Sequence, residues 1–363
     1  MKTLKTIFHN KKVLITGHTG FKGSWLSIWL SNLGANVVGI SNNCVSSPSN
    51  FLVSEVSNVV EDYRFDIRDA DKVKDLVKKA QPDFIFHLAA QALVLPSYED
   101  PLNTLTTNAI GSSNVMDALR FIDKKVIVIM ITSDKVYDNV EWLWGYRETD
   151  QIGGKDPYSA SKGMAELAIR SYVESFFRAK DSSIRIGISR AGNVIGGGDW
   201  AVDRIVPDCM RAWAKGQVVD IRSPNSTRPW QHVLEPLSGY LCLARNLYNN
   251  DRFHGEAYNF GPSANQNYTV KKLIEEMSNY WNQIRWNDVS NSEENPHEAG
   301  LLKLNCDKAL VDLDWHSSLS FNDTVKMTVE WYKEFYQNTD KSMYDFSISQ
   351  IETYSESAGL NKI

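Results

Sequence analysis

Short apolar runs rich in Val, Ile and Leu alternate along the first half of the chain with longer amphipathic stretches. Runs of the first kind are typical of buried strands, and stretches of the second kind are typical of helices. The predicted strands are Val13–Thr16, Asn36–Ile40, Tyr63–Asp66, Phe84–Leu88, Val126–Thr132 and Ile184–Ser189. The predicted helices are Ser24–Leu33, Ala70–Ala80, Leu102–Phe121 and Pro157–Arg178. This alternation predicts an α/β fold with a doubly wound parallel sheet of the Rossmann type.

The alternation breaks after Ile195, where a glycine-rich loop begins and shorter elements follow. Beyond it, Glu256–Pro262 is expected to rejoin the sheet as a strand, and Val270–Trp281 and Phe321–Gln337 are expected to be helices. The pattern favours a Rossmann domain of residues 1–195 plus about 231–262. A smaller interleaved C-terminal substrate-binding domain would comprise about 196–230 and 263–340. The polar tail, 341–363, is expected to form a loosely attached helix.

Composition and charge narrow the class of protein. The chain has 363 residues, of which 42% are hydrophobic and 23% are charged, as in ordinary globular proteins. Its net charge of −5 lacks the excess of positive charge that is typical of proteins that bind nucleic acid. No apolar run approaches the roughly 18 residues that span a membrane. The start of the chain lacks the apolar segment of a signal peptide. The four cysteines are scattered, so we expect no disulfide, no metal site and a cytoplasmic location.

A glycine-rich turn links the first predicted strand to the first predicted helix. Its residues are Gly17, His18, Thr19, Gly20, Phe21, Lys22 and Gly23. Glycines let the backbone approach a pyrophosphate closely, and the amino terminus of the following helix favours negative charge. An ordinary βα turn is the alternative. The strand before the turn and the second βα unit after it favour a dinucleotide site.

Two further segments carry reactive side chains. Ser133, Asp134 and Lys135 follow the most apolar run of the chain, at the end of a strand where open α/β sheets place their chemistry. Tyr158 and Lys162 are spaced to share one face of a helix. A nearby ammonium would favour phenolate and lower the tyrosine pKa from about 10, so that the phenolate can take a proton from a hydroxyl. The two segments predict proton transfer rather than binding alone.

The spacing Gly-x-x-Gly-x-x-Gly, together with Tyr-x-x-x-Lys, resembles the extended short-chain dehydrogenase/reductase family. Longer strings of residues resemble the nucleotide-sugar dehydratases of this family, in the branch that acts on CDP-glucose. The resemblance extends over nearly the whole chain. These strings are Thr132–Lys135, Glu141–Glu148, Arg190–Trp200, Asp203–Asp208, Arg228–Pro236 and Pro296–Ala299. The resemblance implies an NAD-dependent hydro-lyase that converts CDP-glucose to its 4-dehydro-6-deoxy derivative for deoxysugar and O-antigen synthesis. It also implies a homodimer formed through Leu102–Phe121 and Pro157–Arg178.

The same resemblance implies cofactor-binding residues beyond the glycine turn. They are Ser41, Asp66, Ile67, Leu88, Ala89, Ala90, Asn108, Thr132, Tyr158, Lys162 and Arg190. Asp66 and Ile67 match the adenine contact, and Asn108 matches an asparagine behind the active site. NAD-selective members usually carry an acid at the end of the second strand, whereas this strand ends in Ser41, Asn42 and Asn43 with no arginine nearby. We therefore expect NAD, bound more loosely than by a relative that has an aspartate there.

The resemblance also implies roles in the reaction. Tyr158 would take the proton of the C4 hydroxyl, Ser133 would hydrogen-bond the 4-oxygen, and Asp134 would protonate the departing C6 hydroxyl. Lys135 occupies the position of the C5 base, where other nucleotide-sugar dehydratases have a glutamate. A free lysine has a pKa of about 10.4, so a base would need a fall of about 3 units. A charged Lys135 would instead stabilise the enolate electrostatically, and both roles stay open.

The nucleotide end of the substrate requires phosphate contacts, for which planar guanidinium groups are well suited. The expected substrate-binding residues are Gln91, Ser133, Asn193, Arg204, Arg222, Arg228, His232, His297 and Glu298. Two other functions compete with a dehydratase. A nucleotide-sugar 4-epimerase would share the fold, the cofactor and the Tyr158/Lys162 pair, but would not need Asp134 and Lys135. A non-catalytic regulator that senses the dinucleotide would tend to lose the Tyr/Lys pair.

Overall fold

The centre of the protein is a parallel seven-stranded sheet. The structure, a computed structural model, describes residues 3–178, 182–282, 284–290, 301–338 and 340–360. The strands run in the order β11-β6-β5-β4-β1-β2-β3. They are β1 (Lys12–Thr16), β2 (Asn36–Ser41), β3 (Val60–Arg64), β4 (Phe84–His87), β5 (Val126–Ile131), β6 (Ile184–Ala191) and β11 (Ala257–Phe260). The order reverses between β1 and β4, which is the switch point where such sheets bind ligands.

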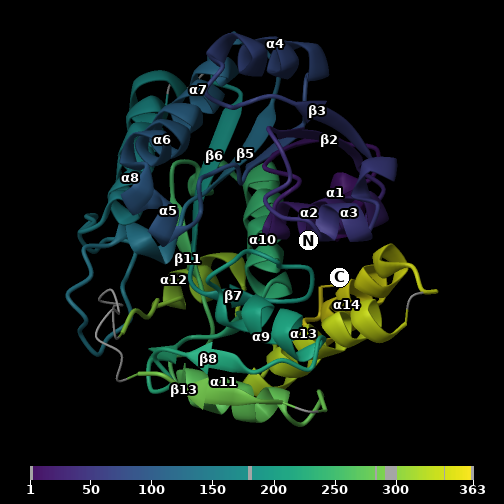
Figure 1. The fold of residues 1–363 in the computed structure, drawn as a ribbon. Coiled ribbons are helices and arrows are strands. Elements are labelled where there is room, and N and C mark those ends of the chain that lie inside the picture. The colour runs from purple at the N-terminus through teal and green to yellow at the C-terminus, as the bar shows by residue number, and fades with distance from the viewer. Residues whose placement is uncertain (1–2, 179–181, 283, 291–300, 339, 361–363) are drawn as a thin grey trace.

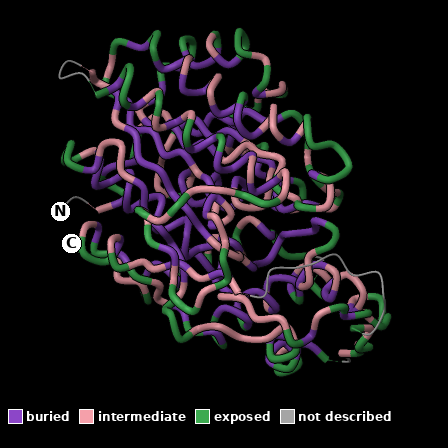
Figure 2. The backbone as a smooth tube through the Cα atoms, turned by 90° about the vertical axis from the view of Figure 1, so that its left-hand side faces the viewer, coloured by how far each residue is buried: buried purple, intermediate pink, exposed green. Residues whose placement is uncertain are grey.

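Helices cover both faces of the sheet (Figure 1). Alternate residues of β5 point to opposite faces: Ile127 and Ile129 join one core cluster, whereas Val128 and Met130 join the other. The first cluster includes α1 (Leu4–Phe8), α2 (Phe21–Asn32) and α10 (Leu234–Asn249), and the second includes α4 (Ala70–Ala80), α7 (Gly111–Ala118) and α8 (Pro157–Tyr172). Burial of both faces explains why the strands are apolar throughout. Figure 2 shows this buried centre, and the predicted doubly wound α/β fold is confirmed.

Several predicted element boundaries are wrong, and three of them have a visible structural cause. The third strand ends at Arg64 rather than Asp66, because the Asp66 carboxylate accepts the backbone N–H of Arg68 at 2.8 Å and closes a turn. The helix expected over Leu102–Phe121 is interrupted by a π-helical turn, η2 (Thr106–Ile110). The helix expected over Pro157–Arg178 also ends in π geometry, η5 (Val173–Phe177). The remaining short elements of this half are α3 (Asn50–Val53), η1 (Val56–Asn58), α5 (Val94–Glu99), α6 (Pro101–Leu105), η3 (Leu119–Phe121) and η4 (Asp134–Val136).

The chain after Ile195 returns along the sheet as α10 and η6 (Asp251–Phe253), and most of its other elements lie below the carboxyl ends of the strands (Figure 1). Its other helices are α9 (Ile205–Trp213), α11 (Val270–Met277), α12 (Asp307–Leu313), α13 (Phe321–Gln337) and α14 (Met343–Ser357). Three two-stranded ribbons accompany them: β7 (Val194–Ile195) with β10 (Gln231–His232), β8 (Val219–Ile221) with β13 (Trp286–Asp288), and β9 (Thr227–Arg228) with β12 (Tyr268–Thr269). As predicted, the chain returns to the large sheet through β11, which pairs with β6.

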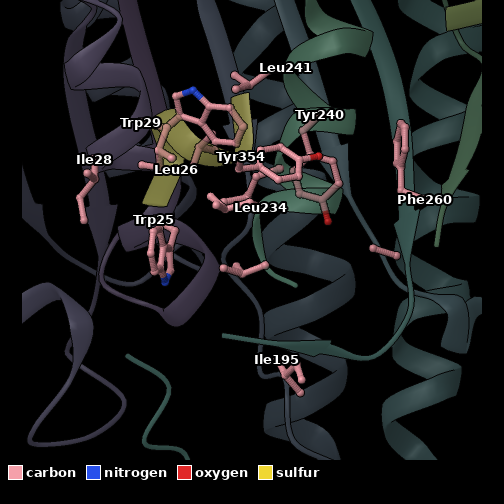
Figure 3. Packing of buried hydrophobic residues seen from close by; sticks show 14 of the residues in the cluster. Trp25, Leu26, Ile28, Trp29, Ile195, Leu234, Tyr240, Leu241, Phe260 and Tyr354 are labelled. Atoms are coloured by element: carbon pink, nitrogen blue, oxygen red, sulfur yellow. The ribbon is translucent and has the colours of Figure 1, made fainter. Parts of the chain in front are cut away.

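The last helix is not loosely attached, and that prediction is wrong. Tyr354 of α14 is 1% exposed and packs edge-on against Trp29 of α2, with 5.9 Å between ring centroids (Figure 3). Its hydroxyl donates to Glu235 at 2.8 Å. The polar composition of the tail concealed this apolar face, because the face is spread over only a few positions of the helix.

Two negative observations apply to the described residues. None of their helices is long and apolar enough to cross a membrane. Among the same residues, no cluster of three His, Cys, Asp or Glu side chains has the arrangement of a metal site.

Candidate active site

The glycine turn after β1 is built for close approach of backbone segments. Gly17 has a φ of +76°, and a Cβ there would lie 2.7 Å from the backbone N of Ala89, within the predicted segment 88–90. A Cβ on Gly23 would lie 2.0 Å from the backbone O of Gly17. Gly20 is the N-cap of α2, so the unpaired N–H groups of the first helical turn lie beside this cradle. The residues present therefore fit the pyrophosphate of a dinucleotide.

The predicted adenine residues follow β3. Ile67 is buried, at 4% exposure. The Asp66 carboxylate accepts Nη2 of Arg68 at 2.7 Å, and the side-chain hydrogen bond from Arg68 is the main reason that the pKa of Asp66 lies below its ordinary value. Asp66, the predicted adenine contact, is thus already paired with an arginine that sequence reasoning did not include.

Asn108 ties two active-site segments together from the π-helical turn η2. Its Oδ1 accepts the backbone N–H of Gln91 at 2.8 Å, and its Nδ2 donates to the Oγ of Ser161 at 2.7 Å. Such turns are frequent at functional sites, and this one aims Asn108 at α8. The Gln91 side chain donates to Leu93 O and Thr104 Oγ1, both at 2.9 Å. The amide of Gln91, predicted to bind substrate, is therefore engaged within the protein.

Ser133, Asp134 and Lys135 lie together at the carboxyl end of β5. Ser133 Oγ donates to Asp134 Oδ1 at 2.8 Å and accepts the backbone N–H of Lys135 at 3.2 Å. Asp134 is buried and Lys135 is half-buried. A short 3₁₀ turn, η4, fixes this arrangement directly after the strand.

Tyr158 and Lys162 approach this group from α8, which contacts η4. Lys162 Nζ lies 5.9 Å from the centroid of the Tyr158 ring. Burial, followed by the charge of Asp134, raises the pKa of Tyr158 to about 12, although Ser133 and Arg204 act in the opposite direction. Burial lowers the pKa of Lys162 to about 8. The predicted fall in the tyrosine pKa is wrong, because desolvation of the phenolate outweighs the groups that favour it, Ser133 and Arg204.

Lys22 is a further cation beside this group. Sequence reasoning assigned it only to the glycine turn. Its Nζ donates to the Tyr240 hydroxyl at 3.4 Å, and Asp134 and Lys162 both act on its charge. Burial lowers the pKa of Lys22 to about 8, with Asp134 opposing the fall. The side chain therefore reaches toward the reactive groups rather than into solvent.

Arg204 also borders the reactive groups rather than a separate nucleotide subsite. Its Nη1 pairs with Asp199 Oδ2 at 2.7 Å. Burial opposes its charge, but Asp199 and then Tyr158 favour it, so that the net effect raises its pKa. Asp199 was not singled out from the sequence, although it stands in the glycine-rich string that follows Ile195.

A pocket with about 230 Å³ of empty space lies beside this group. It brings together Asp134, Lys135, Asn193 and Arg228. A neighbouring pocket of about 320 Å³ shares Asp134 with it. This larger pocket is lined by Asp134, Gly192, Pro229, Gly261, Pro262, Ser263, Ala264, Gln266, Leu302, Lys303 and Leu304. Sequence reasoning missed the lining residues after Gly261, because no local pattern shows that these distant segments converge on the end of β5.

Arg190 does not have a guanidinium free for a cofactor, and that prediction is wrong. Its side chain is fully buried and paired with Glu166 of α8. Its Nη1 donates to the Tyr137 hydroxyl and to Glu148 O. Thr132 Oγ1 donates to Glu166 Oε2 at 3.2 Å. Arg190 and Glu166 thus form a buried ion pair that joins α8 to the ends of β5 and β6.

His232 and Arg222 do not line either of the two pockets, so the structure lends no support to their predicted substrate contacts. His232 is fully buried, and its ring lies edge-on to Trp25 at 6.2 Å. Burial lowers the pKa of His232 to about 3. Arg222 is half-exposed and lies 3.8 Å from Asp203. His297 and Glu298, also predicted to bind substrate, lie outside the described residues.

Comparison with known proteins gives consistent results. The family model described as GDP-mannose 4,6 dehydratase matches residues 14–328. The chain is 43% identical over 340 residues to the CDP-glucose 4,6-dehydratase of Salmonella typhimurium, covering 93% of this chain and 94% of that protein. It is 24% identical to the CDP-paratose 2-epimerase of Salmonella typhi, over 88% of this chain and 98% of that one.

Among solved structures, the epimerase Mth375 of Methanothermobacter thermautotrophicus has a TM-score of 0.76 at 22% identity, covering 92% of this chain and 95% of that one. The UDP-glucose 4-epimerase of Brucella ovis, solved in complex with NAD, has a TM-score of 0.74 at 20% identity, covering 88% and 97%. These two likenesses bear on the fold. With the glycine turn and the Tyr158/Lys162 pair beside Asp134, the family match and the 43% identity show that this chain belongs to the nucleotide-sugar 4,6-dehydratases of the extended short-chain dehydrogenase/reductase family.

Proposed function

We propose that this protein converts CDP-D-glucose to CDP-4-dehydro-6-deoxy-D-glucose and water, for deoxysugar and O-antigen synthesis. One observation carries the proposal: Asp134 and Lys135 share a pocket with Asn193 and Arg228, while Tyr158 acts electrostatically on the same Asp134. An acid, a cationic amine, an alcohol base and a phosphate-binding guanidinium are the groups that a dehydration of a nucleotide sugar requires. The 43% identity to a CDP-glucose 4,6-dehydratase supports the same substrate.

NAD is the cofactor of this reaction, and the glycine turn would hold its pyrophosphate beside α2. Bound there, it would supply a hydride acceptor for C4 of the sugar and, once reduced, a hydride donor for C6, so that no external oxidant would be consumed. We assign cofactor binding to residues 1–195 plus about 231–262. The sugar nucleotide is assigned to about 196–230 and 263–340, which supply Gln266 and Leu302 to the larger pocket.

Tyr158 is the base that accepts the proton of the C4 hydroxyl. Its pKa of about 12 makes the phenolate scarce near neutrality, so nearby cations must favour it during the transfer. Lys162 and Lys22 supply such charge, and Ser133 donates a hydrogen bond to the 4-oxygen. The oxidation at C4 makes the C5 hydrogen acidic, which prepares the loss of water.

Asp134 is the acid that protonates the departing C6 hydroxyl. Lys135, next to it, either removes the C5 proton or stabilises the resulting enolate as a cation. Lys135→Met tests whether Lys135 acts at C5 in either role, by measuring exchange of the C5 hydrogen in deuterated water. Loss of exchange is expected for both roles, whereas exchange at the native rate assigns proton removal elsewhere. Lys155→Met is the matched control, because Lys155 is exposed and lines neither pocket, so its loss should leave exchange unchanged.

The proposal is tested by incubating the protein with CDP-, dTDP-, UDP- and GDP-glucose. A product that absorbs as a 4-keto sugar in alkali, formed fastest from CDP-glucose, is expected. Conversion of the sugar to its C4 epimer without such absorbance would overturn the dehydratase in favour of an epimerase. Equal rates with all four nucleotides would refute the CDP preference alone.

Arg228→Met should raise the KM for CDP-glucose by about tenfold or more, because a charge-assisted phosphate contact is lost.

We also propose a homodimer, formed through the helices at 101–121 and 157–177. Leu102 and Ile110 on one segment are 72% and 52% exposed, and Leu167 on the other is 58% exposed. Apolar side chains gathered on adjoining helices are typical of a subunit interface. Sedimentation should show a dimer that Leu167→Glu converts to a monomer. The cytoplasmic location stays a prediction.

A further inference from the structure

The end of β2 is where a dinucleotide-binding sheet reads the ribose of the adenosine half. An acidic residue there accepts hydrogen bonds from the ribose hydroxyls and repels a 2′-phosphate, whereas a nearby arginine accommodates that phosphate. In this protein β2 ends at Ser41, which is buried. The Ser41 Oγ lies 2.6 Å from Thr19 Oγ1, which also donates to Asn43 O at 2.7 Å. The glycine turn and the end of β2 are therefore joined by neutral groups.

A guanidinium stands beside this point, contrary to the expectation that no arginine is near. Arg64 ends β3 and is the direct partner of Ser41 in the parallel register of β2 and β3. It is distant in sequence from Ser41, so that only the sheet pairing brings the two together. The thiol of Cys44, in the loop that follows β2, is among the groups that favour the Arg64 charge. Arg64 is thus turned toward the loop that borders the ribose.

The position of the guanidinium is well defined. Its Cζ lies 4.9 Å from the centroid of the Phe51 ring. Its Nε and Nη2 donate to Asp62 Oδ2 at 3.0 and 2.8 Å. The side chain keeps 36% of its surface exposed. It is therefore oriented by a ring and a carboxylate, yet remains open to an anion from solvent.

The one carboxylate in this group, Asp62, is already engaged by two other side chains. Asp62 Oδ1 accepts Nε2 of His18 at 2.9 Å, while its Oδ2 accepts Arg64. His18 is fully buried against Gly39, where a Cβ would lie 2.4 Å from the imidazole ring. Both oxygens of Asp62 are thus engaged on its own face of the sheet. With both oxygens already paired, Asp62 does not replace the acid that β2 lacks, whereas Arg64 keeps part of its guanidinium surface exposed at the end of the sheet.

We propose that Arg64 makes this protein accept a 2′-phosphate, so that it binds NADP(H) as well as NAD(H). The inference rests on the proposed use of a nicotinamide dinucleotide. A phosphate monoester carries about −1.5 to −2 charges at pH 7 and has three strong acceptor oxygens. Arginine binds such a group through two parallel hydrogen bonds. The 2′-hydroxyl of NAD carries no charge and gains less from the same guanidinium.

The test is calorimetric titration of the full-length protein with NAD, NADH, NADP and NADPH at low salt. The wild-type protein should bind the phosphorylated and the unphosphorylated form of each oxidation state with Kd values within about tenfold of each other. Arg64→Met should raise the Kd for NADP by about 10- to 100-fold, which is the loss expected for a charged hydrogen bond. The Kd for NAD should change by less than about threefold.

Arg68→Met is the matched control. Arg68 also pairs with an aspartate two residues before it, Asp66, but it lies on the loop at the adenine position. Its removal should change the affinities for NAD and NADP equally. Ser41→Asp should tighten NAD binding and weaken NADP binding, because an acid at this position accepts the ribose hydroxyls and repels the 2′-phosphate.

Two outcomes would overturn the inference. One is wild-type protein that binds NADP more than about tenfold more weakly than NAD, as expected when no cation receives the 2′-phosphate. The other is Arg64→Met that alters the Kd of both cofactors by the same factor. Protein that binds neither dinucleotide would refute the proposed cofactor itself, and this result is distinct from the other two.

Discussion

Replacing Glu166 with Gln should destabilise the protein by about 3–5 kcal/mol, the usual cost of breaking a buried ion pair. The side chains of Glu166 and Arg190 are both 0% exposed, and Nε of Arg190 donates to Glu166 Oε2 at 2.9 Å. Burial by itself would lower the pKa of Arg190, but the hydrogen bond and charge of Glu166 raise it above its ordinary value. The amide keeps the shape of the side chain and removes its charge, which leaves a charged guanidinium buried with neutral partners.

The expected fall in melting temperature follows from the size of the chain. Unfolding entropy is about 2.1 cal/mol/K per residue. Over 363 residues, a loss of about 3–5 kcal/mol lowers Tm by about 4–7 °C. Scanning calorimetry measures this shift, and urea denaturation measures the free energy separately.

Arg170→Met is the matched control from the same network. Arg170 also pairs with Glu166, at 2.8 Å, but its side chain is 41% exposed, so its loss should cost about 1 kcal/mol or less. The double variant Glu166→Leu with Arg190→Met should recover most of the stability, because apolar replacement of a buried pair is often neutral. A Glu166→Gln protein that melts within about 1 °C of the wild type, or that loses no more than Arg170→Met, would refute the reasoning.

Three further predictions concern the active site. Gly23→Ala should abolish measurable NAD binding in calorimetry while the protein stays folded by circular dichroism, because its Cβ would lie 2.0 Å from Gly17 O. Tyr158→Phe should lower kcat by about 10²- to 10⁴-fold. It should also remove the rise of kcat with pH that a base with a pKa of about 12 produces in wild-type turnover assays. The pKa of Lys162 falls from 10.5 to about 8 in the folded protein, so its charged form opposes folding below about pH 8. Lys162→Met should therefore stabilise the protein at pH 7 by up to about 3 kcal/mol in urea denaturation. That gain should shrink as the pH rises from about 8 to 10.5, while turnover is lost at every pH.

Local patterns were sufficient for the elements that bury a regular face. α4 (Ala70–Ala80) and α13 (Phe321–Gln337) have the predicted bounds, because their apolar residues recur with the helical period. The sheet strands were recognisable as continuous apolar runs, since both of their faces are covered. The π-helical turn around Asn108 was not predicted, because its cause is a set of hydrogen bonds to Gln91 and Ser161.

The ionisation of Tyr158 shows where reasoning from spacing fails. Four-residue spacing placed Lys162 correctly on the same helix, but it carried no information about desolvation. In the folded protein burial is the largest influence on both groups, raising the pKa of the phenol and lowering that of the amine. Both the direction and the size of each pKa shift therefore depended on what surrounds Tyr158 and Lys162.

The amino-acid sequence by itself determined the succession of strands and helices along the chain and the glycine turn. It also determined the reactive side chains that follow β5 and begin α8. These features depend on neighbours within a few residues along the chain, so periodicity and spacing report them. Tertiary structure decided which distant residues meet: Arg64 beside Ser41 through strand register, Glu166 against Arg190, and the segment after Gly261 along the pocket at Asp134. Such contacts, and the burial that sets their charges, arise only when the chain closes on itself.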